Sequence, residues 1–330
     1  MFNFNCRSLL RFLKEEMRER GFITMATGAK RYYEVAHNLL ISYRYFSRKP
    51  LPFAIICDQE NEFTADFDQV ILIEHPIHSF LDKLRIPGFA PFNETIFIDS
   101  DCLAYRDLNG LWSIFSHAGD FSYLGYLFPF KQKYGWFQRE GAGIFRDEVK
   151  FSIILQGGLY YMRKGKLADF SRTCQYILDH YDTFVFSHYP YTDPVDEPVF
   201  ALASSIHDYK PARGYDDVFC YYPICNSIRA DIRKGLLSYR YKNTCLYPIG
   251  RYFLHWSMKE VDGALYRQET ERLAEMASSG KSPWLFQELR NRFLDIIPTA
   301  VMHLRQLARK CLPLEFKIRL AALLRRQHRS

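Results

Sequence analysis

Short apolar runs alternate with helical patterns over the N-terminal third of the chain, and this alternation restricts the possible folds more than any other feature. Each run is long enough for a buried strand, and the stretches between the runs place apolar residues at helical spacing. The expected strands are 22–27, 53–57, 69–74 and 95–99, and the expected helices are 30–47 and 78–85. Such βαβ units predict an α/β fold with a Rossmann-like, mostly parallel sheet and helices on both faces.

The remainder of the chain is less regular. Further expected elements are helices at 7–20, 108–117, 166–182 and 197–205 and strands at 121–126, 152–161 and 250–256. Residues 129–146 are rich in glycine, aromatic and basic side chains, which indicates a long loop of the kind that closes over active sites. We expect three regions: an N-terminal helix over 1–21, an α/β domain over 22–280, and a basic helical region over 281–330.

The positive charge of the chain is concentrated at its C-terminal end. The formal net charge is +7, from 44 basic and 37 acidic side chains, and residues 301–330 hold eight of the basic ones and a single acid. Residues 1–300 are therefore balanced. A nucleic-acid-binding domain carries its positive charge on a folded face, so we expect no nucleic-acid partner.

The basic C-terminal region also has an apolar side. Within 299–326 the apolar residues recur at helical spacing, which is typical of a helix on an anionic membrane surface. The alternative is a helix that packs on the body of the protein. A peripheral membrane contact through 299–330 is one expectation, and the two alternatives stay open here.

Cysteine usage indicates the redox environment. The eight cysteines are scattered without any CxxC pair, and no stretch reaches the length of apolar residues that a spanning helix needs. We therefore expect free thiols and a reducing, cytoplasmic setting, with the protein either soluble or peripheral on the membrane.

Two acids mark the end of the fourth expected strand. Asp99, Ser100 and Asp101 follow the apolar residues 96–98 directly. Ligands of parallel α/β sheets bind at the carboxyl ends of strands, and both carboxylates can reach one hard divalent cation there. The triplet predicts a metal–diphosphate site, although a solvated strand-end turn would have the same pattern.

Several spaced motifs around this triplet resemble a known family. Tyr32 stands ten residues before Ser42, and Lys83 stands sixteen residues before Asp99 in a Lys-Leu pair. Together with Asp99-Ser100-Asp101 these motifs resemble glycosyltransferases of the GT-A fold, in particular the glycogenin-like group called family 8. The resemblance spans roughly residues 22–260 and implies a nucleotide-diphospho-sugar transferase fold.

Three later segments extend the resemblance. Gln156, Gly157 and Gly158 stand where the family has an Asn-x-Gly motif, and Asp196-Glu197 stands where it has an Asp-Gln pair. His255 resembles the family's late metal-binding histidine. The family's following Gly-x-x-Lys-Pro-Trp is absent, so only Lys259 could replace its phosphate-contacting lysine.

The resemblance implies a role for each of these positions. It assigns Mn²⁺ or Mg²⁺ to Asp99, Asp101 and His255, and it makes Gln156, Asp196 and Glu197 the catalytic group that faces donor sugar and acceptor. It implies stacking of the nucleobase on Tyr32. The expected nucleotide-sugar contacts are Thr27, Tyr32, Lys83, Asp99, Ser100, Gly157, Gly158 and Lys259.

The resemblance also implies a function. It implies a metal-dependent hexosyltransferase that takes a nucleotide-sugar donor, commonly a UDP-sugar, and retains the anomeric configuration. A saccharide or lipid-linked saccharide of the cell surface is the expected acceptor, and the basic tail favours the lipid-linked one.

Each position also has a purely structural interpretation. Tyr32 is then a helix-face aromatic that packs on the sheet, Lys83 a solvated lysine and His255 a core histidine, while Gly157 and Gly158 mark a bulge and Asp196 begins a helix. Two other functions remain open as well. One is a sugar-phosphate nucleotidyltransferase, for which residues 27–31 are a poor signature, and the other is a non-catalytic membrane-tethered protein with the same fold.

Overall fold

The main sheet confirms the α/β class that the sequence predicts. The computed structural model describes residues 19–187, 193–215, 218–241 and 251–279. Its main sheet has six strands in the order β3-β2-β1-β4-β7-β6, and the first four run parallel. The strand β7 is antiparallel to both of its neighbours, so five of the six strands run in one direction. The strands are β1 (Arg20–Ala26), β2 (Phe53–Cys57), β3 (Gln69–Leu72), β4 (Glu94–Ile98), β6 (Phe121–Phe128) and β7 (Ser152–Arg163).

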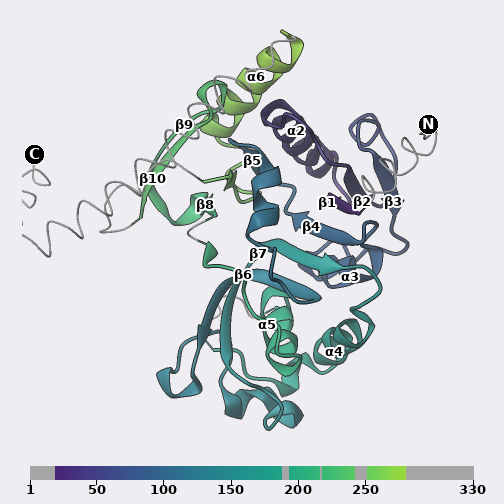
Figure 1. Cartoon of the computed structure of the whole chain (residues 1–330), viewed down its shortest axis with the longest axis vertical. Helices are drawn as coiled ribbons and strands as arrows, with labels where there is room; N and C mark the ends of the chain where they lie inside the picture. The colour runs from purple at the N-terminus through teal and green to yellow at the C-terminus, as the bar shows by residue number, and fades with distance from the viewer. Residues whose placement is uncertain (1–18, 188–192, 216–217, 242–250, 280–330) are drawn as a thin grey trace, which may run out of the picture.

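Apolar side chains bury both faces of this sheet. Neighbouring strand residues point to opposite faces, so Phe22 packs in one core cluster and Ile23 in the other. The helix α2 (Lys30–Phe46) covers the first face, and α4 (Ala168–Asp179) and α5 (Asp196–Ile206) cover the second (Figure 1). The five residues of β2 are all buried, which is why a continuous apolar run predicts this strand correctly.

A second, smaller sheet stands beside the carboxyl end of β4. It consists of β5 (Cys102–Ala104), β11 (Phe253–His255) and β8 (Phe219–Tyr221), with β11 in the middle. The antiparallel hairpin of β9 (Cys225–Asp231) and β10 (Leu236–Tyr241) and the helix α6 (Ala264–Ser278) lie at the same end of the molecule (Figure 1). This sheet matters for function because β11 carries His255 to the end of β4.

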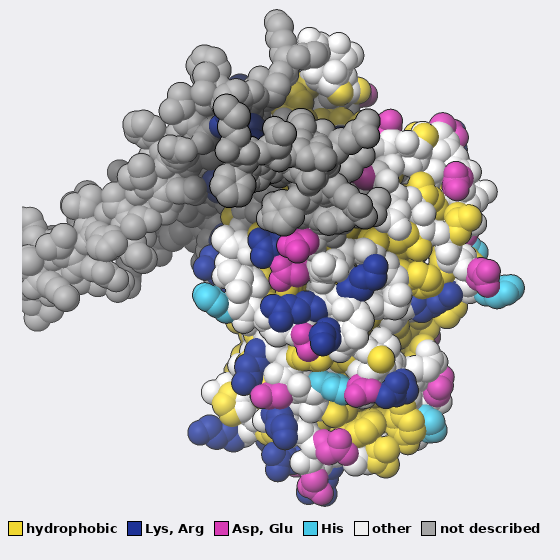
Figure 2. Space-filling model, turned by 45° about the vertical axis from the view of Figure 1, so that its right-hand side comes forward, with side chains coloured by type: hydrophobic (Ala, Val, Ile, Leu, Met, Phe, Trp, Pro, Cys, Tyr) yellow, Lys and Arg dark blue, Asp and Glu magenta, His cyan; other side chains and the backbone are white. Residues whose placement is uncertain are grey.

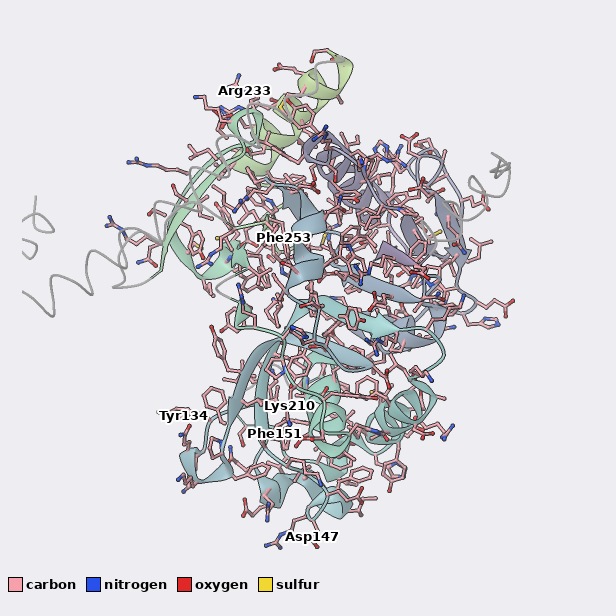
Figure 3. All side chains as sticks on the ribbon, in the orientation of Figure 1. Tyr134, Asp147, Phe151, Lys210, Arg233 and Phe253 are labelled. Atoms are coloured by element: carbon pink, nitrogen blue, oxygen red, sulfur yellow. The ribbon has the colours of Figure 1, made fainter. Side chains whose placement is uncertain are left out.

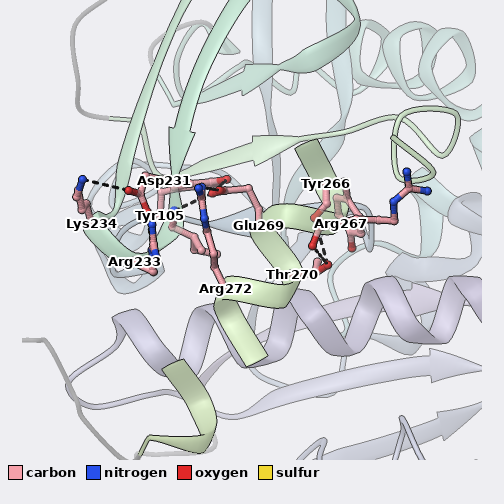
Figure 4. Close-up of polar contacts among 10 residues, drawn as sticks. Tyr105, Asp231, Arg233, Lys234, Tyr266, Arg267, Glu269, Thr270 and Arg272 are labelled. Atoms are coloured by element: carbon pink, nitrogen blue, oxygen red, sulfur yellow. Dashed lines mark hydrogen bonds and ion pairs between the residues drawn. The ribbon is translucent and has the colours of Figure 1, made fainter. Parts of the chain in front are cut away.

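A buried carboxylate connects α6 to this region. Glu269 is completely buried and accepts hydrogen bonds from the Tyr105 hydroxyl at 2.8 Å and from the Ile232 backbone N–H at 2.7 Å (Figure 4). Arg272, one turn further along α6, pairs with the same carboxylate at 2.6 Å. Three segments that are distant in the sequence therefore meet at one charged group.

The remaining helical segments are short, and most are single turns of 3₁₀ helix. They are η1 (Phe80–Arg85), α3 (Ile86–Phe89), η2 (Leu108–Ser113), η3 (Phe130–Gln132), η4 (Arg139–Phe145), η5 (Tyr181–Thr183), η7 (Tyr222–Ile224) and η8 (Ile232–Lys234).

Several expected boundaries need correction. Arg20 and Gly21 belong to β1 and not to an N-terminal helix, because residues 20–23 pair with 94–97 in β4. The expected helix at 108–117 is a 3₁₀ segment of six residues, and the expected loop at 129–146 contains η3 and η4. The rest of the N-terminal helix and the basic region at 281–330 lie outside the described residues.

The described surface carries charges of both signs. On the face drawn in Figure 2, basic and acidic side chains are interspersed, in agreement with the balanced charge of residues 1–300. Among the described residues, no helix is both long enough and apolar enough to cross a membrane.

Candidate functional site

The chain brings its two strand-end acids together with a histidine from the second sheet. Asp99 and Asp101 follow β4, and His255 lies opposite Cys102 in the β11–β5 pair. The Nε2 atom of His255 lies 3.1 Å from Asp101 Oδ1 and 3.6 Å from Asp99 Oδ2. The backbone N–H of Trp256 donates to the Asp101 carbonyl oxygen at 2.9 Å, which holds the two segments in register.

Two glycines of β7 let these side chains approach the sheet. A Cβ atom at Gly158 would lie 2.6 Å from His255 Nδ1, and one at Gly157 would lie 3.0 Å from Asp196 Oδ2. The Asp99 backbone N–H donates to the Gly158 carbonyl at 3.0 Å. The sequence analysis expects these glycines to admit a sugar, and the contact that the structure shows is with the protein's own side chains.

Lys83 reaches the same place from η1. Its Nζ atom lies 2.6 Å from Asp99 Oδ2, and only 11% of the side chain is exposed. Burial by itself would lower the pKa of Lys83, but the charges of Asp99 and Asp196 outweigh burial and raise it. Lys83 is therefore a buried, permanently charged group and not the solvated surface lysine of the structural interpretation.

The first turn of α5 adds two more carboxylates. Asp196 accepts from the Tyr160 hydroxyl at 3.0 Å, and Glu197 accepts from the Gly157 backbone N–H at 2.7 Å. Burial raises the pKa of Asp196, and it raises the pKa of Glu197 to about 7 with a further contribution from Asp196. The neighbouring Gln156 accepts from the Gly158 backbone N–H at 2.6 Å.

These side chains form an acidic cluster: Asp99, Asp101, Asp196 and Glu197 with Lys83 and His255. Four carboxyl groups face one lysine and one histidine, so acidic groups outnumber basic groups in the cluster by two. Burial disfavours the charged form of Asp101 and raises the pKa of this carboxyl group. Burial alone would lower the pKa of His255, but the neighbouring Asp101 carboxylate has the larger effect and raises it.

The residues present fit a divalent cation. Asp101 Oδ1 and His255 Nδ1 are buried and lack a hydrogen bond of good geometry, although Asp101 Oδ1 lies close to His255 Nε2. Unsatisfied, buried oxygen and nitrogen ligands beside an excess of acidic groups suit a metal ion. Among the described residues, Asp101, Cys102 and His255 form a group whose ligand atoms lie within 4.8 Å of one another.

The sequence analysis missed Cys102. Strand pairing places Cys102 directly opposite His255, and neighbours paired in this way have side chains on the same face. The residue follows Asp101 in the sequence, so only the pairing with β11 shows that it lies near the candidate ligands. The presence of a thiol beside Asp101 and His255 widens the range of metals that the group can accept.

The remaining predicted contacts are Thr27, Ser100, Tyr32 and Lys259. Thr27 is half-buried where β1 ends, and Ser100 is buried between the two acids. Tyr32 packs partly against the core, and the Arg31 guanidinium lies 5.3 Å from its ring centre. Lys259 is exposed, four residues after His255, and takes part in none of the ion pairs described above.

A second polar group at the same edge of the sheet escaped the sequence analysis. Asp58 directly follows β2 and accepts from the Gly28 backbone N–H at 3.1 Å and from the Tyr33 hydroxyl. His78 has a φ of 57° and lies beside Gly28 and Asp58. The sequence signal for Asp58 is a carboxylate that directly follows a buried strand, which is also the signal for Asp99.

The segment 129–146, which the sequence predicts to be a long loop, packs in part against β7. The Trp136 backbone N–H donates to the Ile153 carbonyl at 2.7 Å, and its indole N–H donates to the Leu155 carbonyl at 3.2 Å. Phe137 is completely buried. In Figure 3, Tyr134 and Asp147 lie at the far end of the lower part of the molecule, well away from Phe253 in β11. Burial of its aromatic side chains explains why this segment packs against β7.

Comparisons with known proteins give structural neighbours but no sequence family. No family model matches the chain, and the search of curated proteins found no match either. Among the solved structures that resemble it are the galactosyltransferase LgtC in complex with donor and acceptor sugar analogs and an active-site mutant of LgtC. Both have 12% sequence identity and a TM-score of 0.48; they cover 81% and 82% of this chain and 99% of their own.

Proposed function

We propose that this chain is a GT-A glycosyltransferase that moves a hexose from a nucleotide-sugar to a saccharide or lipid-linked saccharide. The observation that carries the proposal is the acidic cluster. In it, His255 lies within 3.6 Å of both Asp99 and Asp101, and Lys83 pairs with Asp99. The cluster stands at the carboxyl edge of a mostly parallel sheet, where ligands of open α/β folds bind.

Asp101, His255 and Asp99 would hold Mn²⁺ or Mg²⁺. When bound, such a cation neutralises a leaving diphosphate and acts as a Lewis acid. Lys83 contributes a second positive charge, and its pairing with Asp99 keeps that charge in place before substrate arrives. Asp99 therefore has two roles in the proposal: it orients Lys83 and it faces the metal.

Transfer breaks the bond between the anomeric carbon and the phosphate oxygen and forms a bond from that carbon to an acceptor oxygen. The acceptor hydroxyl must lose its proton in this step. Glu197 is suited to accept it, because its pKa of about 7 is close to the pH of the cell. Asp196 and Gln156 would orient the sugar beside it, and the family resemblance favours retention of configuration.

The nucleotide would lie along the same edge of the sheet. In the proposal the base stacks on Tyr32, the diphosphate contacts Lys83 and Ser100, and Thr27 lines the pocket. Lys259 would approach the phosphates only if its exposed side chain turned toward the cluster. Gly157 and Gly158 would leave room for the side chains of Asp196 and His255 beside the sugar. The resemblance favours UDP as the nucleotide.

Calorimetric titration of the full chain with nucleoside diphosphates, with and without Mn²⁺, tests the proposal. We expect UDP to bind in a Mn²⁺-dependent manner, and Asp101→Asn to reduce that binding at least a hundredfold. Asp179→Asn is a matched control, because Asp179 is an exposed acid at the end of α4. Screening of UDP-sugars for hydrolysis and transfer then identifies the donor.

The titration also separates the alternatives. Absence of binding to any nucleotide favours a non-catalytic protein with this fold and overturns the proposal. Release of pyrophosphate from a nucleoside triphosphate and a sugar phosphate would instead support a nucleotidyltransferase. Unchanged binding in Asp101→Asn would remove the metal assignment from Asp101.

A further inference from the structure

One cysteine of the second sheet and one of the neighbouring hairpin lie in direct contact. Cys220, in β8, is completely buried, and Cys225, at the start of β9, is half-buried. Their Sγ atoms are 3.3 Å apart, and the Cys225 thiol also approaches the Tyr221 carbonyl at 3.2 Å. Neither is part of a disulfide in the structure. A disulfide has an S–S length of about 2.0 Å, so closure needs a movement of only about 1.3 Å.

We propose that Cys220 and Cys225 form a reversible intramolecular disulfide, which makes this turn a site of oxidative modification. The short segment between them contains η7 (Tyr222–Ile224), and one turn of 3₁₀ helix keeps the two thiols on the same side. This proximity is independent of the acidic cluster and of the proposed transferase activity.

A low-molecular-weight disulfide such as oxidised glutathione can supply the oxidation. The Cys225 thiolate attacks one sulfur of that disulfide, forms a mixed disulfide and releases one thiolate. Cys220 then loses its proton and attacks the Cys225 sulfur, which releases the second thiolate. Two protein thiols are thus oxidised while one small disulfide is reduced to two thiols. The half-buried Cys225 reacts first because solvent reaches it, and the buried Cys220 resolves the mixed disulfide.

The turn between the cysteines contacts the candidate metal site. Tyr221 pairs with His255 across β8 and β11, and the two rings lie 5.0 Å apart. The next residue, Tyr222, stacks on Trp256 at 4.8 Å. A disulfide between Cys220 and Cys225 would draw in the backbone that carries both tyrosines, so oxidation changes the packing around His255 and Trp256.

Peptide mass spectrometry gives a direct test with the full chain. Both cysteines lie between Arg213 and Arg229, so trypsin releases them in one peptide, residues 214–229. The folded protein is incubated with oxidised or reduced glutathione, denatured, alkylated and digested. We expect the oxidised sample to give this peptide two hydrogens lighter and without alkyl groups, and dithiothreitol to restore two alkylation sites.

Matched measurements separate this result from general thiol oxidation. The peptides with Cys57 and Cys174, which are buried singly, should stay fully alkylated in both samples. The intrinsic fluorescence of the four tryptophans, of which Trp256 is one, should change on oxidation of the wild type and stay constant in Cys225→Ser. Two alkylated cysteines in peptide 214–229 after oxidation, or a stable glutathione adduct on Cys225, would overturn the proposal. A protein that binds no nucleotide would leave this test unaffected.

Discussion

At the scale of single residues, the buried charged groups of the candidate site also affect the stability of the fold. Lys83 is the clearest example of a stabilising group, because its ammonium group is buried among carboxylates and pairs with Asp99. Removal of one partner from a buried ion pair leaves an uncompensated charge. We expect Lys83→Met to lower the free energy of unfolding by about 3 kcal/mol, as measured by urea denaturation.

A surface lysine provides the control for this prediction. Lys30 pairs with Glu62 in full contact with solvent, and exposed pairs contribute little. Lys30→Met should leave the urea midpoint unchanged. Equal losses in the free energy of unfolding of the two variants would mean that the buried Lys83–Asp99 pair contributes no more to stability than an exposed pair.

Glu197 has the opposite effect on stability. Its pKa rises from an ordinary 4.5 to about 7 in the folded protein, so folding disfavours its ionised form. The resulting loss in the free energy of unfolding is absent below pH 4.5 and grows as the pH rises. It is complete above pH 7, where it reaches about 3 kcal/mol. We expect Glu197→Gln, which keeps an acceptor for the Gly157 N–H, to stabilise the protein at pH 8 but not at pH 4.

Thermal unfolding across this pH range measures the effect. Glu271→Gln is the control, since Glu271 is an exposed glutamate of α6. A stability gain of equal size at pH 4 and pH 8 would argue against ionisation of Glu197 as its cause.

At the scale of secondary-structure elements, one buried glutamate holds the hairpin and α6 together. Glu269 accepts from Tyr105 and Ile232, and both donors are buried with it (Figure 4). Glu269→Ala leaves both donors without a partner, and each such loss costs about 1–3 kcal/mol. We expect a loss of about 3 kcal/mol in the free energy of unfolding and faster hydrogen exchange at the Ile232 amide.

Glu275→Ala provides the control on the same helix. Glu275 is exposed, so this variant should keep the exchange protection of Ile232. Loss of protection in both variants would show that α6 as a whole, and not the Glu269 contacts, determines the stability of the hairpin.

Several elements that sequence patterns identified have residues that are mostly buried or periodic. The strands β1, β2 and β4 and the helix α2 belong to this class. The hairpin β9–β10 was missed, because four of the seven residues of β9 are polar or charged and none of its side chains is fully buried. Helix α6 was missed although Tyr266, Leu273 and Met276 lie at helical spacing.

The residues of the candidate site also differ in whether the sequence could predict them. Asp99 and Asp101 follow β4 directly, and His255 and Lys83 lie beside them, while the roles that the strand-end position and the family resemblance give these residues stay predictions. Pairing between β5 and β11 is a long-range contact without a local pattern, so nothing in the sequence placed Cys102 opposite His255. The same holds for the approach of Cys220 to Cys225 across a turn.

At the scale of the whole molecule, the charge distribution divides the chain into a balanced body and a basic end. We propose that the basic end binds anionic membranes, which would bring the acidic cluster to a lipid-linked acceptor. Each basic residue near such a surface contributes about 1 kcal/mol, so replacement of four by glutamine should weaken binding by about three orders of magnitude. The four residues are Arg305, Arg309, Lys310 and Lys317.

Sedimentation with vesicles of phosphatidylserine and phosphatidylcholine tests this prediction. Binding should fall as salt rises, since salt screens surface charge. The control replaces four exposed lysines of the body and changes the net charge equally: Lys131, Lys164, Lys166 and Lys210. Because the sequence predicts that the basic tail also has an apolar side, the control, which leaves the tail unchanged, should bind as the wild type does. Equal weakening in both variants would mean that net charge drives the association, and salt-independent behaviour without any binding would favour a tail packed on the body.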